Sequence, residues 1–225
     1  MMSRRARLIV LGAVAAVMLV VVGGYAFFAL TGEDAPPPPR LEGKPAAGAG
    51  AAAGAGRWQP VPAAGTFVGY RVNEEYLGVG VRTAVGRTSA VTGTVTVDGR
   101  RVEAADLRAD MTKVRSDQSR RDDTLRYRGI ETDRYPTARF TLAAPFALSA
   151  APRPTSGTLD LHGRRAPITV TVRGQRVAGG RLELVGSAPI RFTSFAIEPP
   201  SVAGLVSVRD HGVVEFRLVL AQAGA

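Results

Sequence analysis

The chain has 225 residues and a formal net charge of +10, and Lys44 and Lys113 are its only lysines. It has no cysteine, which excludes a disulfide framework and thiolate metal sites. The basic residues are scattered singly rather than clustered with aromatics, which argues against nucleic-acid binding. An anionic lipid or an anionic envelope polymer remains compatible with this charge.

Residues 8–30 carry no charge and follow a basic tail, residues 1–7. At about 1.5 Å per residue they span roughly 34 Å as a helix, enough for a hydrocarbon core of about 30 Å. The positive-inside rule places the N-terminus in the cytoplasm and the rest of the chain outside it. The alternative is a cleaved signal peptide and secretion, but the run is long and ends in Phe27, Phe28 and Leu30. We therefore expect an uncleaved single-pass anchor in the plasma membrane.

Residues 31–57 have the composition of a linker. Pro36 to Pro39 favour a stiff polyproline II segment, and residues 46–56 form a flexible tract of alanine and glycine. Neither part carries the large apolar side chains from which a core is built. We expect the folded domain to comprise residues 58–225.

From Trp58 onward, apolar and polar residues alternate with a period of two, which is typical of antiparallel strands with one apolar face. The predicted strands cover residues 66–72, 89–99, 105–114, 137–148, 157–163, 166–174, 181–192 and 211–221. Two all-β architectures fit about eight such strands: a two-sheet sandwich and a closed up-and-down barrel. The long meander from neighbour to neighbour favours the barrel.

The interior of an eight-stranded barrel is either filled by its own side chains or holds one elongated ligand. Val, Ala and Gly are plentiful at the predicted inward positions and Phe and Trp are few, which favours a ligand over a solid core. The apolar residues that we expect to line such an interior are Val95, Val97, Leu107, Met111, Phe140, Leu142, Leu159, Leu161, Ile168, Val170, Leu182, Leu184, Phe192, Phe216 and Leu218.

One charged segment interrupts the strands and is predicted to be a short helix. Ser116 and Asp117 are suited to a helix start, and Gly129 can end the helix. The helix either closes one end of the barrel or is a solvated crossover. Its arginines pair well with diphosphate or carboxylate groups, so they are candidates for a ligand head-group site, the alternative being a solvated helix stabilised by its own acids. These arginines are Arg120, Arg121, Arg126 and Arg128.

Two further features bear on function. The long loop at residues 194–212 contains apolar residues that suit a lid over a barrel mouth, or it is an ordinary packed loop. His162 and His211 each precede a glycine, so we interpret them as turn residues that bond a backbone group. No pattern indicates a metal site or a catalytic nucleophile, and we expect neither metal ligands nor catalytic residues.

Several separated motifs resemble the YceI-like family, in particular its membrane-anchored, actinobacterial-type members. They are Arg121-Asp122, Leu125-Arg126, Tyr135-Pro136-Thr137 with Phe140, VGRTSAVTG (85–93), LDLHGRRAPITVTV (159–172) and DHGVVEFRL (210–218). The resemblance covers residues 58–220. It implies a lipocalin-like barrel with a long apolar tunnel, which binds polyisoprenoids or other long amphiphiles outside the cytoplasm and is not an enzyme. The chain departs from the family pattern at Arg128-Gly129-Ile130 and lacks the family's usual histidine between residues 73 and 80.

The first functional hypothesis is therefore a membrane-tethered protein that stores or transports a long-chain amphiphile such as a polyisoprenoid. We expect no cofactor other than a bound isoprenoid or fatty amphiphile, and no nucleic-acid partner. The alternative is a ligand-free envelope module that binds an anionic polymer or a membrane protein.

Overall fold

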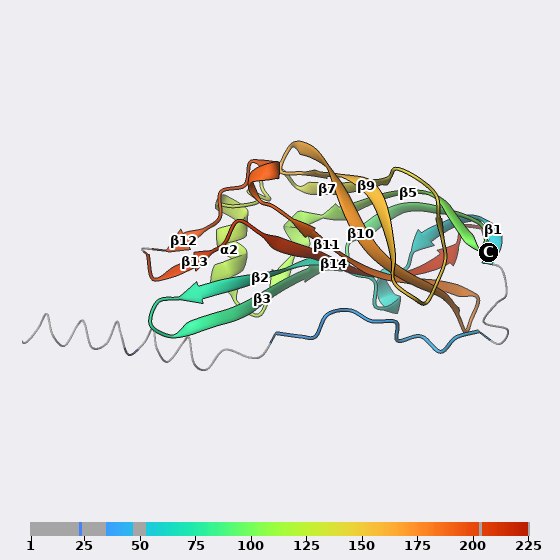
Figure 1. Ribbon diagram of the computed structural model, residues 1–225, viewed down its shortest axis with the longest axis horizontal. Coiled ribbons are helices and arrows are strands. Elements are labelled where there is room, and N and C mark those ends of the chain that lie inside the picture. The colour runs from blue at the N-terminus through green and yellow to red at the C-terminus, as the bar shows by residue number, and fades with distance from the viewer. Residues whose placement is uncertain (1–22, 24–34, 47–52, 203, 225) are drawn as a thin grey trace, which may run out of the picture.

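The computed structural model describes residue 23 and residues 35–46, 53–202 and 204–224. Its main element is a closed antiparallel barrel of eight strands, as the sequence predicts (Figure 1). In barrel order the strands are β1 (Ala53–Pro60), β4 (Val91–Gly99), β5 (Arg101–Asp110), β7 (Thr137–Leu142), β9 (Arg153–Leu161), β10 (Arg164–Val177), β11 (Arg181–Ile190) and β14 (Gly212–Gln222). Because β1 pairs with both β4 and β14, the sheet closes on itself and is not a two-sheet sandwich.

The remaining elements are shorter or lie beside this ring. They are β2 (Phe67–Tyr76), β3 (Gly80–Thr88), β6 (Arg115–Ser116), β8 (Phe146–Ala147), β12 (Ser201–Val202), β13 (Val206–Val208), the helix α2 (Ser119–Tyr127) and the 3-10 turns η1 (Pro62–Ala64), η2 (Met111–Lys113) and η3 (Thr193–Phe195). β2 follows β1 along the same edge of β14 and forms a hairpin with β3. The β12–β13 hairpin then extends the sheet from β2. One end of the barrel is thus closed by β1, and the other carries the two hairpins.

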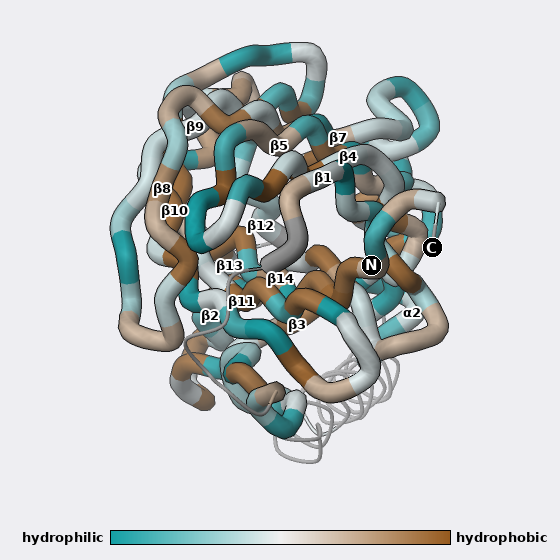
Figure 2. Tube along the Cα trace, turned by 90° about the vertical axis from the view of Figure 1, so that its right-hand side faces the viewer, coloured by the Kyte–Doolittle hydropathy of each residue, from teal (hydrophilic) through white to brown (hydrophobic). Residues whose placement is uncertain are grey.

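Large apolar side chains fill the end that β1 closes. Trp58 is 1% exposed and packs in one cluster with Leu182, Leu220, Val97 and Val102. The colouring of Figure 2, which views the molecule from this end, shows apolar and polar residues alternating along the strands. At about 25 cal/mol per Å² of apolar surface, this cluster is a major contribution to stability. It makes this end of the barrel blind.

The helix α2 confirms the prediction of one short helix, but it begins at Ser119 rather than at Ser116. Ser116 belongs to β6, where it pairs with Gly86, and its backbone N–H and hydroxyl both donate to the Asp122 carboxylate. Strand pairing therefore holds the predicted cap residue in extended backbone. Past the end of the helix, Gly129 adopts a φ of +69°, a conformation that glycine reaches without strain.

Residues 35–46, which we name the strap, run along the outside of the barrel (Figure 1). At its start, the Pro36 and Pro37 carbonyls accept hydrogen bonds from Arg71 and Arg87. At its end, Pro45 forms an isolated bridge with Val177, the last residue of β10. Part of the predicted linker therefore lies against the barrel, and β1, which begins at Ala53, was not among the predicted strands. The domain boundary at residue 58 stays a prediction.

Two carboxylates on the outer face of the barrel are buried by the strap and by arginines of β2, β3 and β14. Glu215 binds Arg71 and Arg87, and Glu183 binds Arg217, each carboxylate being 1% exposed. Glu183 also accepts hydrogen bonds from the backbone N–H groups of Glu42 and Gly43 in the strap. Burial alone would raise the pKa of Glu183, but these hydrogen bonds, with those of Arg217 and Gln175, hold it below its ordinary value.

His162 joins three segments at the opposite end of the barrel. Its Nδ1 lies 3.0 Å from the Phe195 carbonyl oxygen and its Nε2 lies 2.7 Å from the Glu131 carboxylate. His162 does bond a backbone group, but the carbonyl belongs to a segment 33 residues away and not, as we had expected, to its own turn. His211, in contrast, is exposed, and only its backbone N–H bonds a neighbour, the Arg209 carbonyl.

The predicted anchor at residues 8–30 lies, apart from Gly23, outside the described residues. Within the described part of the chain, no helix has the length and apolarity needed to cross a membrane.

Candidate functional site

A cavity of about 370 Å³ lies at the end of the barrel that carries the two hairpins, which we name the mouth. Strand β2, helix α2 and the loop before β14 surround it. Among the residues predicted from sequence, it is lined by Met111, Leu159, Leu161, Phe192, Arg120, Arg121 and Arg128. The helix therefore covers the barrel end, and it is more than a solvated crossover.

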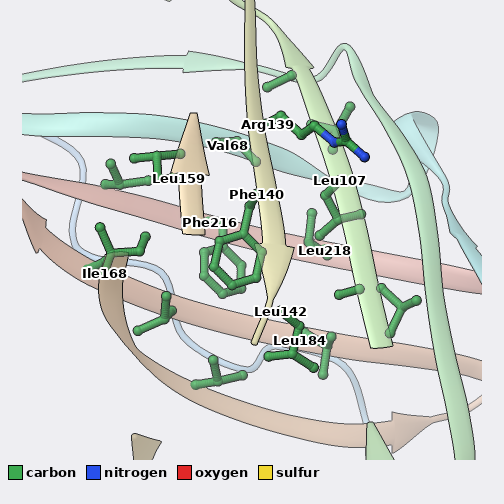
Figure 3. A pocket seen from close by; sticks show the side chains of 18 of the residues that line it. Val68, Leu107, Arg139, Phe140, Leu142, Leu159, Ile168, Leu184, Phe216 and Leu218 are labelled. Atoms are coloured by element: carbon green, nitrogen blue, oxygen red, sulfur yellow. The ribbon is translucent and has the colours of Figure 1, made fainter. Parts of the chain in front are cut away.

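A second, narrower cavity of about 100 Å³ continues into the barrel (Figure 3). Val68, Ala138, Leu159 and Val214 line both cavities, which places them at the junction. The residues predicted from sequence that line this deeper part are Val95, Leu107, Phe140, Leu142, Leu159, Ile168, Val170, Leu184, Phe216 and Leu218. The two adjoining cavities give the barrel an apolar interior that extends from the mouth toward the blind end, and we refer to them together as the channel.

Three of the predicted contact residues lie elsewhere, and this corrects the sequence-based list. Val97 and Leu182 line neither cavity, because they pack around Trp58 in the closed end. Arg126 is exposed on α2 and pairs with Asp133 at 3.2 Å, so its guanidinium points away from the mouth. An alternating pattern identifies an inward side chain, but it does not show at which level a barrel is plugged.

Two glycines make room for aromatic rings that line the deeper cavity. A Cβ atom at Gly157 would lie 2.2 Å from the Phe140 ring, and one at Gly186 would lie 2.6 Å from the Phe216 ring. The outer edge of each ring therefore reaches the backbone of a neighbouring strand at the glycine. A larger residue at either glycine would displace the ring.

The mouth contains a buried ion pair that the sequence analysis missed. Arg121 donates two hydrogen bonds to Glu74, from Nε at 2.8 Å and from Nη2 at 2.9 Å, and it also contacts Asp117 and the Ser116 hydroxyl. Burial lowers the pKa of Arg121, but the bonds and charges of Glu74 and Asp117 outweigh burial and raise it above its ordinary value. Two carboxylates thus neutralise this guanidinium within the protein.

Two tyrosines accompany this pair on β2. The Tyr76 hydroxyl donates to Glu74 at 2.9 Å, and burial together with the Glu74 charge raises the pKa of Tyr76 to about 12. The Tyr70 hydroxyl is buried without a hydrogen-bond partner among the described residues, and burial raises its pKa well above the ordinary value. Tyr70 lines the mouth cavity and lies against Gly86, where a Cβ atom would be 2.8 Å from the hydroxyl oxygen. Tyr70 therefore keeps a protonated hydroxyl, without a partner among the described residues, buried behind the cavity wall.

The inward side chains of β2 alternate along its whole length, and a predicted strand that extended past residue 72 would have included all of them. Val68, Tyr70, Val72, Glu74 and Tyr76 are two residues apart and all line the mouth cavity. The predicted strand stopped at residue 72, so Glu74 stayed outside it. A carboxylate on the apolar face of a strand predicts a buried partner of opposite charge, because burial of an isolated charge costs too much free energy.

Residues of the predicted lid segment also line the mouth cavity. Ile197, Pro200, Val206 and Val208 contribute to its wall, and η3 and the β12–β13 hairpin hold them there. This placement favours a cover over the mouth rather than a loop packed elsewhere. The described residues contain no group of three His, Asp or Glu side chains arranged as metal ligands.

A closed antiparallel barrel with an apolar channel open at one end belongs to the lipocalin-like class of barrels. Within that class the chain is a member of the YceI-like family, whose domain model matches residues 58–220. The resemblance seen in the separated motifs is thereby confirmed at the level of the family. No curated protein matches the chain.

Solved structures of low sequence identity share the fold. A polyisoprenoid-binding domain from Saccharophagus degradans, implicated in plant cell wall breakdown, is 19% identical with a TM-score of 0.56, over 75% of this chain and 99% of that one. BcnA from Burkholderia cenocepacia is 18% identical with a TM-score of 0.56, over 72% and 99% of the two chains. A YceI protein from Campylobacter jejuni is 16% identical with a TM-score of 0.50, over 62% and 85%.

Proposed function

We propose that the protein is a membrane-tethered, extracytoplasmic binding protein for a long-chain amphiphile such as a polyisoprenoid. The apolar chain of the ligand occupies the barrel channel, and residues 8–30 anchor the protein in the plasma membrane with the N-terminus in the cytoplasm. The role is storage or transport of the ligand, without catalysis.

The observation that carries this proposal is the channel itself. A mouth cavity of about 370 Å³ falls within the range of about 300–1,000 Å³ that is usual for ligand pockets, and the deeper cavity extends it along the barrel. Its wall is apolar except for a few polar groups at the mouth. The polyisoprenoid-binding domain among the structures of the same fold supports a chain-like ligand.

The ligand competes with the bilayer rather than with water. Burial of each CH₂ group away from water yields about 0.8 kcal/mol, but a membrane provides nearly the same gain. The channel therefore needs only to match the bilayer as a solvent for the chain. Selectivity then comes from the width of the channel and from the polar groups at the mouth.

Those polar groups favour an uncharged oxygen on the ligand over an anion near Arg121. Glu74 and Asp117 already neutralise Arg121, so a diphosphate there would meet two carboxylates. The Tyr70 hydroxyl, in contrast, is a buried donor without a partner among the described residues. A carbonyl, hydroxyl or ether oxygen at the head of the chain would accept its hydrogen bond once the Tyr70 ring turns toward the cavity.

Tyr70→Phe should weaken the binding of an oxygen-bearing isoprenoid about fivefold, because one hydrogen bond contributes about 1 kcal/mol. Binding of the matching hydrocarbon should not change, and the empty protein should be at least as stable as the parent. Fluorescence displacement with a prenyl alcohol and its alkene gives both affinities. An equal loss of affinity for the alcohol and the alkene would show that Tyr70 contributes to binding by packing alone.

Native mass spectrometry tests the binding function directly. The fragment 35–225 should be used, because the strap from residue 35 contacts the barrel, and it should be purified without detergent. We expect a stoichiometric long-chain species that organic extraction releases and identifies. A protein without bound lipid that also takes up no added isoprenoid would contradict the proposal and favour an interaction module with a filled barrel.

A further inference from the structure

Exposed apolar side chains gather at the mouth. In the described part of the chain, the large hydrophobic residues that are exposed are Leu77, Val81, Tyr127 and Leu205, of which Leu77 is 67% exposed. Leu77 and Val81 lie at the tip of the β2–β3 hairpin, Leu205 at the tip of the β12–β13 hairpin, and Tyr127 at the end of α2. Figure 1 shows α2, β12, β13 and the ends of β2 and β3 at the same end of the molecule.

The two hairpin tips form one structural unit. The Leu77 backbone N–H donates to the Leu205 carbonyl at 2.9 Å, and β13 pairs with β2 immediately beside this bond. The hairpins and α2 also line the mouth cavity, so the exposed residues surround its opening. Clustered apolar residues at one end of a soluble barrel indicate a contact surface.

The strap begins at this same end. Ala35 and Pro36 lie in a surface pocket with Arg115, Ser116 and Asp117, next to the start of α2. The predicted anchor ends at residue 30, and five residue steps span at most about 18 Å. A chain that leaves the bilayer at residue 30 therefore reaches the barrel beside its mouth, and not at the blind end.

The charge of the mouth suits a membrane surface. Arg120 and Arg128 are exposed at the cavity rim, and neither forms an ion pair with another described residue. Of the acids nearby, Glu75 and Asp133 are each paired with an arginine, whereas Asp123 on α2 and Glu198 in the lid segment add negative charge to this end. Unpaired arginines beside exposed apolar side chains are characteristic of protein surfaces that lie on anionic bilayers.

We propose that the hairpin tips and the end of α2 dock on the lipid bilayer, so that the channel opens directly into the membrane surface. This inference rests on the proposed tether and lipid-binding function, and it adds an orientation to them. Leu77, Val81, Tyr127 and Leu205 enter the interface, and Arg120 and Arg128 contact anionic head groups. A ligand then passes between bilayer and channel without crossing water.

Because the chain contains no cysteine, single labels test this orientation in the full-length protein. Leu77→Cys and Leu205→Cys would each carry a polarity-sensitive fluorophore, in proteoliposomes of zwitterionic and anionic phospholipid with nitroxide-labelled acyl chains. Ala151→Cys, which is exposed between β8 and β9 near the blind end, is the matched control. We expect several-fold stronger quenching at positions 77 and 205 than at 151. Arg120→Gln with Arg128→Gln should reduce the quenching, as should added salt.

Equal quenching at all three positions, or none at positions 77 and 205, would overturn the proposed orientation. Shielding of the fluorophores without lipid quenching, together with disulfide cross-links between copies of the unlabelled Leu77→Cys variant, would assign the surface to a second copy and also overturn it. Native mass spectrometry separates the two proposals. Quenching of the fluorophores at the mouth of a protein that carries no lipid would contradict the proposed binding function. Bound lipid without such quenching would contradict only the proposed docking.

Discussion

Arg121→Ala should lower the free energy of unfolding by about 3 kcal/mol. Glu74 is 9% exposed, and its carboxylate binds Arg121 through two hydrogen bonds. Removal of the guanidinium leaves a buried carboxylate whose remaining partner is the Tyr76 hydroxyl. Breaking a buried pair in this way typically costs about 3–5 kcal/mol, and the partial exposure of both side chains places the value at the lower limit. Urea denaturation monitored by Trp58 fluorescence measures the change.

Arg126→Ala is the matched control, because Arg126 lies on the same helix but is exposed and pairs only with Asp133. We expect no measurable change in its stability. The double variant Arg121→Met with Glu74→Leu should recover most of the lost stability, since an apolar pair leaves no unpaired charge. If Arg121→Ala releases the bound lipid but leaves the melting temperature unchanged, Arg121 is a head-group ligand and not a structural residue.

Ala138→Phe should reduce the affinity for a long-chain isoprenoid about 100-fold. Ala138 lies at the junction of the two cavities, so a phenyl ring there separates the mouth from the deeper channel. In buffer without lipid or detergent, exclusion of about four CH₂ groups leaves them in water and forfeits roughly 3 kcal/mol, at about 0.8 kcal/mol each. A short isoprenoid that fits in the mouth cavity should bind as before. Titration with isoprenoids of increasing length gives the affinity against chain length.

Ala144→Phe, in the exposed turn after β7, is the control for the added ring and should bind every chain length like the parent. The melting temperature of Ala138→Phe should stay near that of the parent, because the ring enters space that the protein leaves open. An unchanged affinity for the longest isoprenoid would show that ligands do not use the deeper channel.

The alternating pattern predicted antiparallel strands and most of the lining residues, and the meander from strand to neighbouring strand favoured a barrel over a sandwich. Strands such as β4 and β9 bury one face more than the other, so a period of two identifies inward residues such as Val95 and Leu159. The helix was equally visible, since its charged residues and Gly129 break that period. Both features follow from the local order of apolar and polar residues, so they can be predicted from the sequence alone.

The strap, β1 and the Glu74–Arg121 pair depend on contacts between residues that are distant in the sequence. The alternating pattern carries no information about such contacts. The sequence of β1 is rich in alanine and glycine, and it forms a strand because its backbone pairs with β4 and β14. The Pro36 carbonyl is held by an arginine that lies 35 residues away. Such partners become evident only when the closed barrel places them side by side.

The plug around Trp58 makes the barrel a molecular ruler. If the channel holds a chain as proposed, that chain stops where the packed cluster begins, so the protein would take up a fixed length of any ligand, however long that ligand is. The surplus of a longer isoprenoid stays outside the protein. Loading and unloading then become a single reversible sliding motion through one opening, in which the last segment to enter is the first to leave.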